Sequence, residues 1–317
     1  MKLRIGLWMV ATAALLGAQT QVDLGRQVRN VLPFSSGGTN ASTQSGARAS
    51  VGPTFLVATD FPGADIGAQV NNAFASFGAG QCGAVAVPTG TYTYSSGPIF
   101  VPSGCTLTGA GFGSQPKYGT RLLYSGPAAT SAVVLMKSDY SRSDYAVLEN
   151  VHIADGNSTL CPNNGMLAWE TASSSRKCYD GTSYTAATVH LAAVQHGQIN
   201  PTTLNDGTHI IIRNVDIDGD AQGVYPNQGG FHLGVYLNGC EECSIENVVV
   251  HQADDGFYVG KATNGVIFHQ ITARNNRRAG FHYRGPSHFL CNECLFESNA
   301  WIGQTPDPAK YGAGLRG

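Results

Sequence analysis

The stretch IENVVVHQADDGFYVG, residues 245–260, contains the pattern that decides the fold. Its first six residues place an apolar residue two positions before a polar one, and apolar residues then alternate along the chain. Four other segments have the same pattern: LENVHI at 148–153, IRNVDI at 212–217, FHQITA at 268–273 and CNECLF at 291–296. The segments at 245, 268 and 291 begin 23 residues apart. A fixed period in the low twenties is typical of solenoid proteins.

A second motif repeats in step with the first, as GVYL at 234, GFYV at 256 and GFHY at 280. Each unit therefore contains two or three strand-like pieces and no helical pattern. The leucine-and-asparagine consensus of leucine-rich repeats is missing. Charged residues make up only 13% of the chain and glycine is abundant, which suits short strands and turns better than long amphipathic helices. The sequence predicts an all-β parallel β-helix solenoid, in which each coil stacks its strands on the next.

The repeat predicts which residues align between coils. One column should face the core, and its members are Val151, Val215, Val248, Ile271 and Cys294. The preceding column is polar, and its members are Asn150, Asn214, Asn247, Gln270 and Glu293. A polar column beside the core must satisfy its hydrogen bonds. Stacked amides at a bend can do so along the axis, so this column predicts a structural ladder.

Several quoted motifs resemble the pectate-lyase-like superfamily of right-handed parallel β-helices, and most closely its rhamnogalacturonase/epimerase-like subgroup. They are the helical pattern at 64–77, then CGAVAVPTGTY at 82–92 and VPSGCTLTGAGFGS at 101–114. The resemblance implies a right-handed solenoid with an N-terminal capping helix, over roughly residues 55–300. It does not imply one activity, because the superfamily contains lyases, hydrolases, epimerases, tailspikes and adhesins.

The chain divides into three predicted parts. Residues 1–20 have a basic start and a short apolar run, which is typical of a secretory signal peptide. Residues 21–52 are polar and rich in glycine and serine, as in a flexible linker. Residues 53–317 form the predicted β-helix domain, with a loop insertion at 154–208 that breaks the period. We expect a secreted, periplasmic or cell-surface protein, with no membrane span in the mature chain.

Eight cysteines in an exported chain favour disulfides over metal sites. Cys82 and Cys105 lie one coil apart, so stacking predicts a bridge between them, and a second bridge is predicted between Cys161 and Cys178. The two C-x-x-C pairs, Cys240/Cys243 and Cys291/Cys294, also match the local spacing of zinc ligands. Disulfides or buried thiols explain them better, although their pairing stays open.

The GVYL-type coils predict a functional face. Tyr236, Tyr258 and His282 should align and point outward, between two inward columns. Two residues before each glycine stand His232, Asp254 and Arg278, which the coil spacing of ~4.8 Å would bring within hydrogen-bonding reach. We expect this face to be exposed and contiguous, with Arg277 and Arg284 beside it.

The chemistry predicted for this face is the processing of a polysaccharide. The candidate catalytic residues are Asp254, Asp255, Arg278 and His282, and the candidate substrate-binding residues are His232, Tyr236, Tyr258, Arg277 and Arg284. Asp-Asp also occurs in the polygalacturonase branch of the superfamily. That branch has an additional Asp one coil earlier and a Gly-His-Gly one coil later, where this chain has Leu233 and Ala279. The hydrolase site is therefore incomplete.

Three readings stay open. A lyase would need a cation, often Ca²⁺, which Asp254 and Asp255 would help to hold. A glycoside hydrolase would need two carboxylates about 5–9 Å apart. A non-catalytic carbohydrate-binding or adhesin-like module would use the aromatic residues alone. The expected partner is a pectin-like or other acidic polysaccharide, and the formal charge of −2 gives no footprint for nucleic acid.

The end of the sequence shows no amphipathic helix or charged tail that would cap a last coil. The spacing predicts that Gly303 restarts the coil, 23 residues after Gly280. We therefore expect the native protein to be longer than the 317-residue chain.

Overall fold

A computed structural model describes residues 55–78, 81–112, 119–126, 133–136, 145–156, 166–170, 175–179, 184–186, 190–197, 207–219, 231–260, 263–276, 278–284, 288–299 and 313–316. Backbone contacts divide the chain into Met1–Gly52 and Pro53–Gly317. The predicted signal peptide and linker lie outside the described residues. The second unit contains every strand and helix discussed below.

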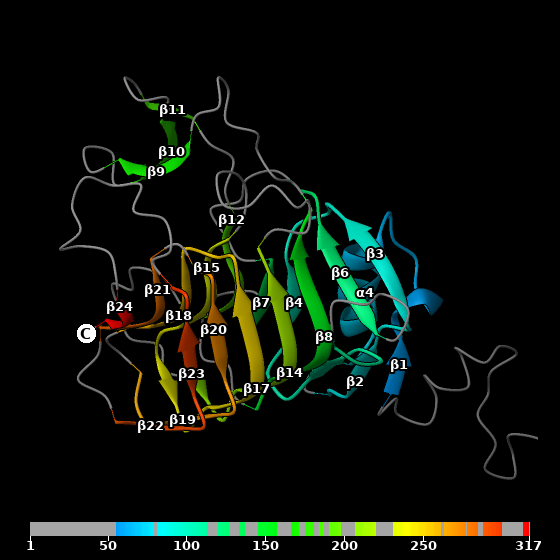
Figure 1. Ribbon diagram of the computed structural model, residues 1–317. Helices are drawn as coiled ribbons and strands as arrows, with labels where there is room; N and C mark the ends of the chain where they lie inside the picture. Colours follow the sequence, from blue (N-terminus) through cyan, green and yellow to red (C-terminus); the bar gives the residue numbers. More distant parts are fainter. Residues whose placement is uncertain are drawn as a thin grey trace, which may run out of the picture. The chain divides into compact units, whose positions relative to one another are not determined.

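The larger of two parallel sheets has twelve strands (Figure 1). Its main path runs through β1 (Phe55–Val57), β2 (Ala84–Ala86), β5 (Thr106–Thr108), β8 (Val147–Asp155), β14 (Ile211–Asp218), β17 (Ser244–His251), β19 (Val266–His269) and β22 (Phe289–Asn292). Beside this path lie β3 (Gly90–Tyr94), β6 (Thr120–Tyr124), β20 (Thr272–Arg274) and β23 (Leu295–Glu297). All of these strands pair in parallel.

The second parallel sheet has seven strands. In spatial order they are β4 (Ile99–Val101), β7 (Val134–Met136), β12 (His190–His196), β15 (Phe231–Leu237), β18 (Asp255–Val259), β21 (Ala279–Tyr283) and β24 (Ala313–Arg316). The chain passes from β17 in the large sheet to β18 in the small one, and then back to β19 and β20. This alternation between two parallel sheets is the parallel β-helix that the repeat predicts.

The predicted inward column is buried. Val151, Val215 and Val248 are paired in register on β8, β14 and β17, and each is fully buried. Phe268 from the large sheet packs edge-on against Phe257 and Phe281 from the small sheet. The core therefore lies between the two sheets, and the alternate residues of every strand point away from it.

The polar column forms the expected ladder, but in two separate pieces. Its five members all have positive φ, between 50° and 59°. Asn247 donates to the side-chain oxygen of Asn214, and Asn214 donates to that of Asn150, over 2.9 and 3.0 Å. Gln270 donates instead to Glu293, over 2.8 Å. Asparagine tolerates this left-handed corner better than most residues, which explains why it recurs there.

A single α-helix, α4 (Ile66–Ala75), covers the first coils and follows a short 3₁₀ turn, η2 (Ala58–Asp60). Asp65 is its N-cap, and the Asp65 carboxylate accepts from the backbone N–H of Ala68. Ile66, Val70 and Phe74 form its buried face, as the sequence period predicts.

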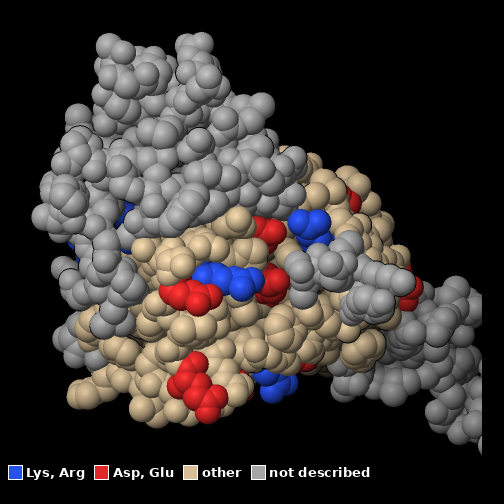
Figure 2. Space-filling model, in the orientation of Figure 1, with Lys and Arg blue, Asp and Glu red and all other residues tan. Residues whose placement is uncertain are grey.

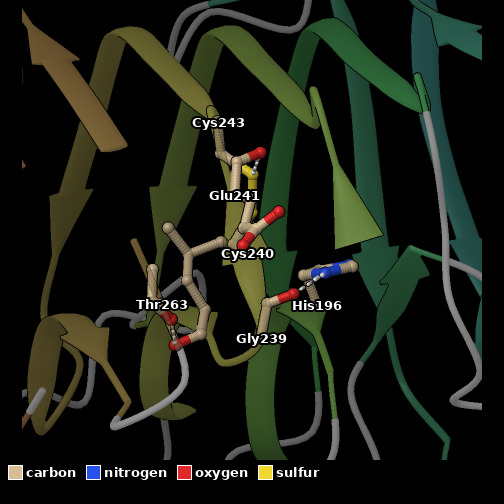
Figure 3. Close-up of a disulfide and its surroundings, with 7 residues drawn as sticks. His196, Gly239, Cys240, Glu241, Cys243 and Thr263 are labelled. Carbon is tan, nitrogen blue, oxygen red and sulfur yellow. Dashed lines mark hydrogen bonds between the residues drawn. A yellow bond between two sulfur atoms is a disulfide. The ribbon is translucent and has the colours of Figure 1, made fainter. Parts of the chain in front are cut away.

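Disulfides join consecutive coils and also close corners. Cys82 and Cys105 are bridged, with their Cα atoms 5.1 Å apart. The pairs Cys240–Cys243 and Cys291–Cys294 are bridged within single corners. Each of these two bridges spans a residue with positive φ, Glu242 or Glu293, so it constrains the bend directly. The C-x-x-C pairs are therefore disulfides and not zinc ligands (Figure 3).

The corner around Cys240 is further fixed by the neighbouring coils. Thr263 donates its hydroxyl to the carbonyl of Leu237, and a ring nitrogen of His196 lies 3.3 Å from the carbonyl of Gly239 (Figure 3). A short two-stranded sheet pairs β13 (Gly207–Thr208) with β16 (Cys240–Glu241) at the same level. Backbone pairing, side chains and disulfide thus hold one bend together.

The structure corrects the predicted loop insertion at 154–208. Part of it forms a three-stranded antiparallel sheet of β9 (Met166–Glu170), β10 (Ser175–Tyr179) and β11 (Tyr184–Ala186). Another part, β12, lies inside the solenoid and pairs with β7 and β15. The insertion therefore contains a regular coil strand, which the sequence period failed to reveal because the flanking residues shift its spacing.

The last described strand corrects the predicted restart of the coil. β24 pairs with β21 through Ala279↔Ala313 and Phe281↔Leu315. This register places Gly314, and not Gly303, opposite Gly280. No helix in the described part of the chain is long and apolar enough to cross a membrane.

Candidate functional site

The candidate site lies on the outer face of the seven-stranded sheet. Tyr236 on β15, Tyr258 on β18 and His282 on β21 stand in register, as the glycine motif predicts. The Tyr236 and Tyr258 rings stack with centroids 5.2 Å apart, and the centroids of Tyr258 and His282 are 4.7 Å apart. The three rings form one continuous row across three coils.

The prediction that this row is solvent-exposed is wrong. Tyr236 retains 3% of its exposure and His282 retains 8%, while Tyr258 is partly buried. Tyr236 packs with Ala192 and Leu233 in a small apolar cluster that is separate from the main core. The register is therefore correct, because the rings point away from the core. They are buried because neighbouring outward side chains pack around them.

Asp254 and His232 form a close pair between consecutive coils. Nδ1 of His232 lies 2.9 Å from Oδ2 of Asp254. Because a carboxylate can only accept, Nδ1 carries the proton and Nε2 carries the lone pair of the neutral ring. The Asp254 side chain is 6% exposed and the His232 side chain 19%. A histidine whose tautomer is fixed by a carboxylate is a common general base.

Arg278 does not pair with the side chain of Asp254, as the column predicts, but with that of Asp255. Its backbone N–H donates to the carbonyl of Asp254 over 2.8 Å. Its guanidinium forms a two-point contact with the Asp255 carboxylate, through Nε at 3.2 Å and through Nη2. Nδ1 of His282 also lies 3.0 Å from Asp255. Consecutive strand residues point to different sides, so the arginine reaches the second aspartate.

Asp255 is fully buried and is nevertheless held as an anion. Burial alone would raise its pKa, but the charge of Arg278, followed by the hydrogen bond and charge of His282, brings the pKa below its usual value. Its carboxylate is therefore a fixed negative charge that orients a cation and an imidazole. A group with no exposed surface cannot itself transfer a proton to a polymer.

Tyr236 is held in the opposite state. Burial is the main reason that its pKa is raised, and the neighbouring Tyr258 raises it further, against the lowering effect of a hydrogen bond with Asn238. The phenol therefore stays protonated at any physiological pH and can serve as a hydrogen-bond or proton donor.

Glycine is required where the outer and inner layers come closest. A Cβ atom on Gly256 would lie 2.6 Å from the carbonyl oxygen of Gly280 and 2.9 Å from Cβ of Ala273. The same atom on Gly234 would lie 2.5 Å from the carbonyl oxygen of Gly256. The repeated glycine therefore lets adjacent coils stack closely directly after the Asp-Asp pair.

The structure adds a residue that the sequence did not predict. Gln195 on β12 stands in register with Tyr236 and so extends the row by one coil. It is 2% exposed, and its Oε1 has no hydrogen-bond partner among the described residues. Only the spacing of β12 could have found it, and the insertion at 154–208 hides that spacing.

The remaining predicted residues contribute less. Arg284 is exposed at the end of β21, and its backbone N–H donates to Val259. Arg277 lies outside the described residues, as does Cys161, so the bridge from Cys161 to Cys178 stays a prediction. His251 and His269, predicted as hydrogen-bonded or solvated surface residues, both have side-chain partners.

The residues present do not fit a calcium ion. Calcium needs six to eight oxygen ligands, whereas the carboxylates of Asp254 and Asp255 already bind His232, Arg278 and His282. Within the described residues, no group of three or more His, Cys, Asp or Glu side chains is arranged to hold a metal. No step of the chemistry below passes through a metal.

Solved structures of other proteins share this architecture. The A-module of the Azotobacter vinelandii mannuronan C-5 epimerase AlgE4 matches with a TM-score of 0.51 and 16% identity. The match covers 83% of this chain and 60% of that one. The fold is a parallel β-helix. At this identity the likeness concerns the fold alone, and the chain spans about 60% of the length of that neighbour.

Two further structures match less well. A mutant of DFA-IIIase from Arthrobacter chlorophenolicus A6, in complex with DFA-III, has a TM-score of 0.49 at 13% identity, over 78% of this chain and 65% of that one. ORF18 of Geobacillus virus E2 has a TM-score of 0.44 at 15% identity, over 84% of this chain and 46% of that one. No protein-family model and no curated protein sequence matches the chain.

Proposed function

We propose that this protein acts on a uronate-containing polysaccharide by removing the proton next to a sugar carboxylate, as a lyase or an epimerase. The observation that carries the proposal is the Asp255–Arg278–His282 cluster, which lies beside the His232–Asp254 pair and the tyrosine row. A cation, an oriented imidazole, a protonated phenol and stacked rings thus occupy one face.

Each group has a defined role in this reaction. Arg278, held by Asp255, supplies the positive charge that stabilises the carboxylate of a uronate and the negative charge that develops on it. His232, held by Asp254, is the base that removes the C5 proton. Tyr236, kept protonated, is the donor that returns a proton, either to C5 or to the departing oxygen. Asp254 and Asp255 are positioning residues, because each acts through its partner.

A hydrolytic mechanism has less support. Glycoside hydrolases use two carboxylates that both reach the scissile bond. Here Asp255 is fully buried and both carboxylates are engaged by neighbouring side chains. The name of the A. vinelandii neighbour, a C-5 epimerase, also supports chemistry at C5.

The second candidate is glycan binding without turnover, as in an adhesin-like module. The burial of Tyr236 and Asp254 favours it, because tightly packed groups stabilise a coil whether or not they react. Bridges at Cys82–Cys105 and Cys240–Cys243 are typical of oxidising compartments, which supports a role outside the cytosol for either candidate.

Incubation with a panel of polyuronates in D₂O distinguishes these readings. We expect deuterium at C5 of the recovered polymer, or unsaturated ends that absorb ultraviolet light. New reducing ends without either signal would assign a hydrolase instead. Binding without any chemical change in the polymer would assign a binding module, and either of these results would overturn the proposal.

A further inference from the structure

A polar groove of about 410 Å³ lies on the outer face of the twelve-stranded sheet. It crosses the strands β8, β14, β17 and β19 at the corner where the amide ladder runs. Its lining is formed by Glu149, Asn150, Arg213, Asn214, Glu246, Asn247, His269 and Gln270. None of these residues belongs to the candidate site described above.

The groove and the candidate site lie on opposite faces of the coil. Phe268 points into the core and touches Phe257 and Phe281 of the other sheet. Its neighbour His269 therefore points outward on one side, whereas Tyr258 points outward on the other. A molecule that fills the groove thus occupies a separate surface.

The amides along the groove keep half of their hydrogen-bonding capacity unused. A side-chain amide has two N–H donors and an oxygen with two lone pairs. Among the described residues, Asn214 donates one N–H to Asn150 and accepts one from Asn247. A second donor and a second lone pair remain at this rung. The groove therefore presents donors and acceptors side by side, one set per coil, at a spacing of ~4.8 Å.

A row of alternating charges runs parallel to the amides. Arg213 donates through Nε and Nη2 to one oxygen of Glu149, both over 2.6 Å, and its side chain is still 48% exposed. Glu246 accepts from the hydroxyl of Ser244 on one oxygen, over 2.6 Å. Both glutamates thus keep a second oxygen beyond these bonds, and the row carries two carboxylates for one guanidinium.

We infer that this groove binds a neutral, hydroxyl-rich saccharide chain laid along the axis of the solenoid. Carboxylate oxygens and the guanidinium pair with neighbouring hydroxyls as acceptor and donor, and the amides do both. An acidic chain is disfavoured because carboxylates outnumber arginine in the row. An extended chain suits the groove because the same set of groups recurs at every coil. The inference does not depend on the reaction at the candidate site.

Binding of neutral oligosaccharides to the whole chain tests this inference. The probes are cello-, manno- and galacto-oligosaccharides of four to six units, followed by saturation-transfer NMR and calorimetry. We expect at least one series to bind, and Arg213→Ala and Glu246→Gln each to weaken that binding at least about tenfold. Arg274→Ala is the matched control, because Arg274 is an exposed cation of the same sheet outside the groove.

Thermal melts decide whether each variant is folded, and Glu246→Gln, which keeps the shape of the side chain, decides the outcome if Arg213→Ala unfolds. The inference is overturned if no neutral series binds the native chain, or if Glu246→Gln binds as the native chain does. It is also overturned if oligouronates bind more tightly than neutral chains and lose that binding in Arg213→Ala, since the groove would then recognise anions.

Discussion

At the scale of single residues, the two adjacent aspartates have different environments and different expected roles. Asp254 fixes the tautomer of His232 and keeps slight exposure, whereas Asp255 is fully buried between Arg278 and His282. Alternation along a strand separates them, because neighbouring side chains cannot point to the same side. Substitutions at the two positions should therefore have different consequences.

Asp254→Asn should lower kcat by roughly a hundredfold or more, because an amide no longer fixes the His232 tautomer that carries the lone pair on Nε2. Steady-state kinetics on the uronate polymer that the native chain turns over measures the effect, together with its pH profile. A purely structural role would lower the melting temperature and leave kcat and the pH profile of the folded fraction unchanged.

Asp255→Asn should lower the free energy of unfolding by about 3 kcal/mol, because it leaves the Arg278 guanidinium partly buried without its anion. Urea denaturation of the two proteins measures the difference. Glu297→Gln is the control, because Glu297 is an exposed carboxylate on β23 and its replacement should change stability by less than about 0.5 kcal/mol. Equal effects of the two substitutions would refute the role given to Asp255.

The row Tyr236, Tyr258 and His282 was predictable from the glycine period alone, since a fixed period sets the register. Its burial was not, because Ala192 comes from a strand that the insertion at 154–208 conceals. The partner of Arg278 was also beyond reach. A long side chain chooses between two adjacent carboxylates according to angles that a residue pattern does not contain.

At the scale of elements, a second ionic cluster joins three strands of the large sheet. Asp216 on β14 lies 3.2 Å from Nε2 of His251 on β17 and 3.5 Å from Nδ1 of His152 on β8. Asp218 lies 3.7 Å from the other ring nitrogen of His251. Near the centre of Figure 2, a basic patch lies between two acidic ones, so on this face the charges form neighbouring pairs.

This cluster predicts a pH window for stability. Burial would raise the pKa of Asp216, but the hydrogen bond from His251 and nearby positive charges lower it. Burial would lower the pKa of His251, but Asp216 and Asp218 raise it. The aspartate contribution is present above its unfolded value of 3.8 and lost as pH falls through the lower folded pKa. The histidine contribution is present below 6.5 and lost as pH rises through the higher folded pKa.

Melting temperatures between pH 4 and 9 measure this dependence. The native chain should lose stability as pH rises above about 6.5, and His251→Gln should remove part of that slope. Asp216→Asn should remove a similar part, because it deletes the main partner that raises the pKa of His251. A slope that both variants retain in full would show that other groups cause it.

The disulfides differ in the length of chain that they close. Replacing both Cys82 and Cys105 by alanine should lower the free energy of unfolding by about 3 kcal/mol, since their bridge closes a whole coil. Replacing both Cys240 and Cys243 should lower it by only about 2 kcal/mol, since that bridge closes one corner. Chemical denaturation of the two double variants tests the order, and a reversed order would contradict it.

At the scale of the whole molecule, the period predicted the parallel sheets, the core columns and the corner ladder. It did not predict where the ladder changes. Among the described residues no side-chain hydrogen bond joins Asn247 to Gln270, because Gln270 donates to Glu293 instead. The longer glutamine side chain reaches the next coil in the other direction, which a shared polar position does not reveal.

The coils beyond this break should open first. Leu290 is 61% exposed and Leu295 49% exposed, whereas Val215 and Val248 are fully buried. Hydrogen exchange should therefore be faster for the amides of β22 and β23 than for those of β14 and β17. Exchange at one uniform rate across all four strands would mean that the stack opens as a single unit.

The register between Val151, Val215 and Val248 has a consequence for editing the chain. Because each coil repeats the contacts of its neighbour, a duplicated coil would find its own partners above and below, and the stack would lengthen by one strand spacing of ~4.8 Å. A single added residue within β14 would instead turn the core side chains beyond it toward water. Length can therefore change in this protein only by whole turns, like the thread of a screw.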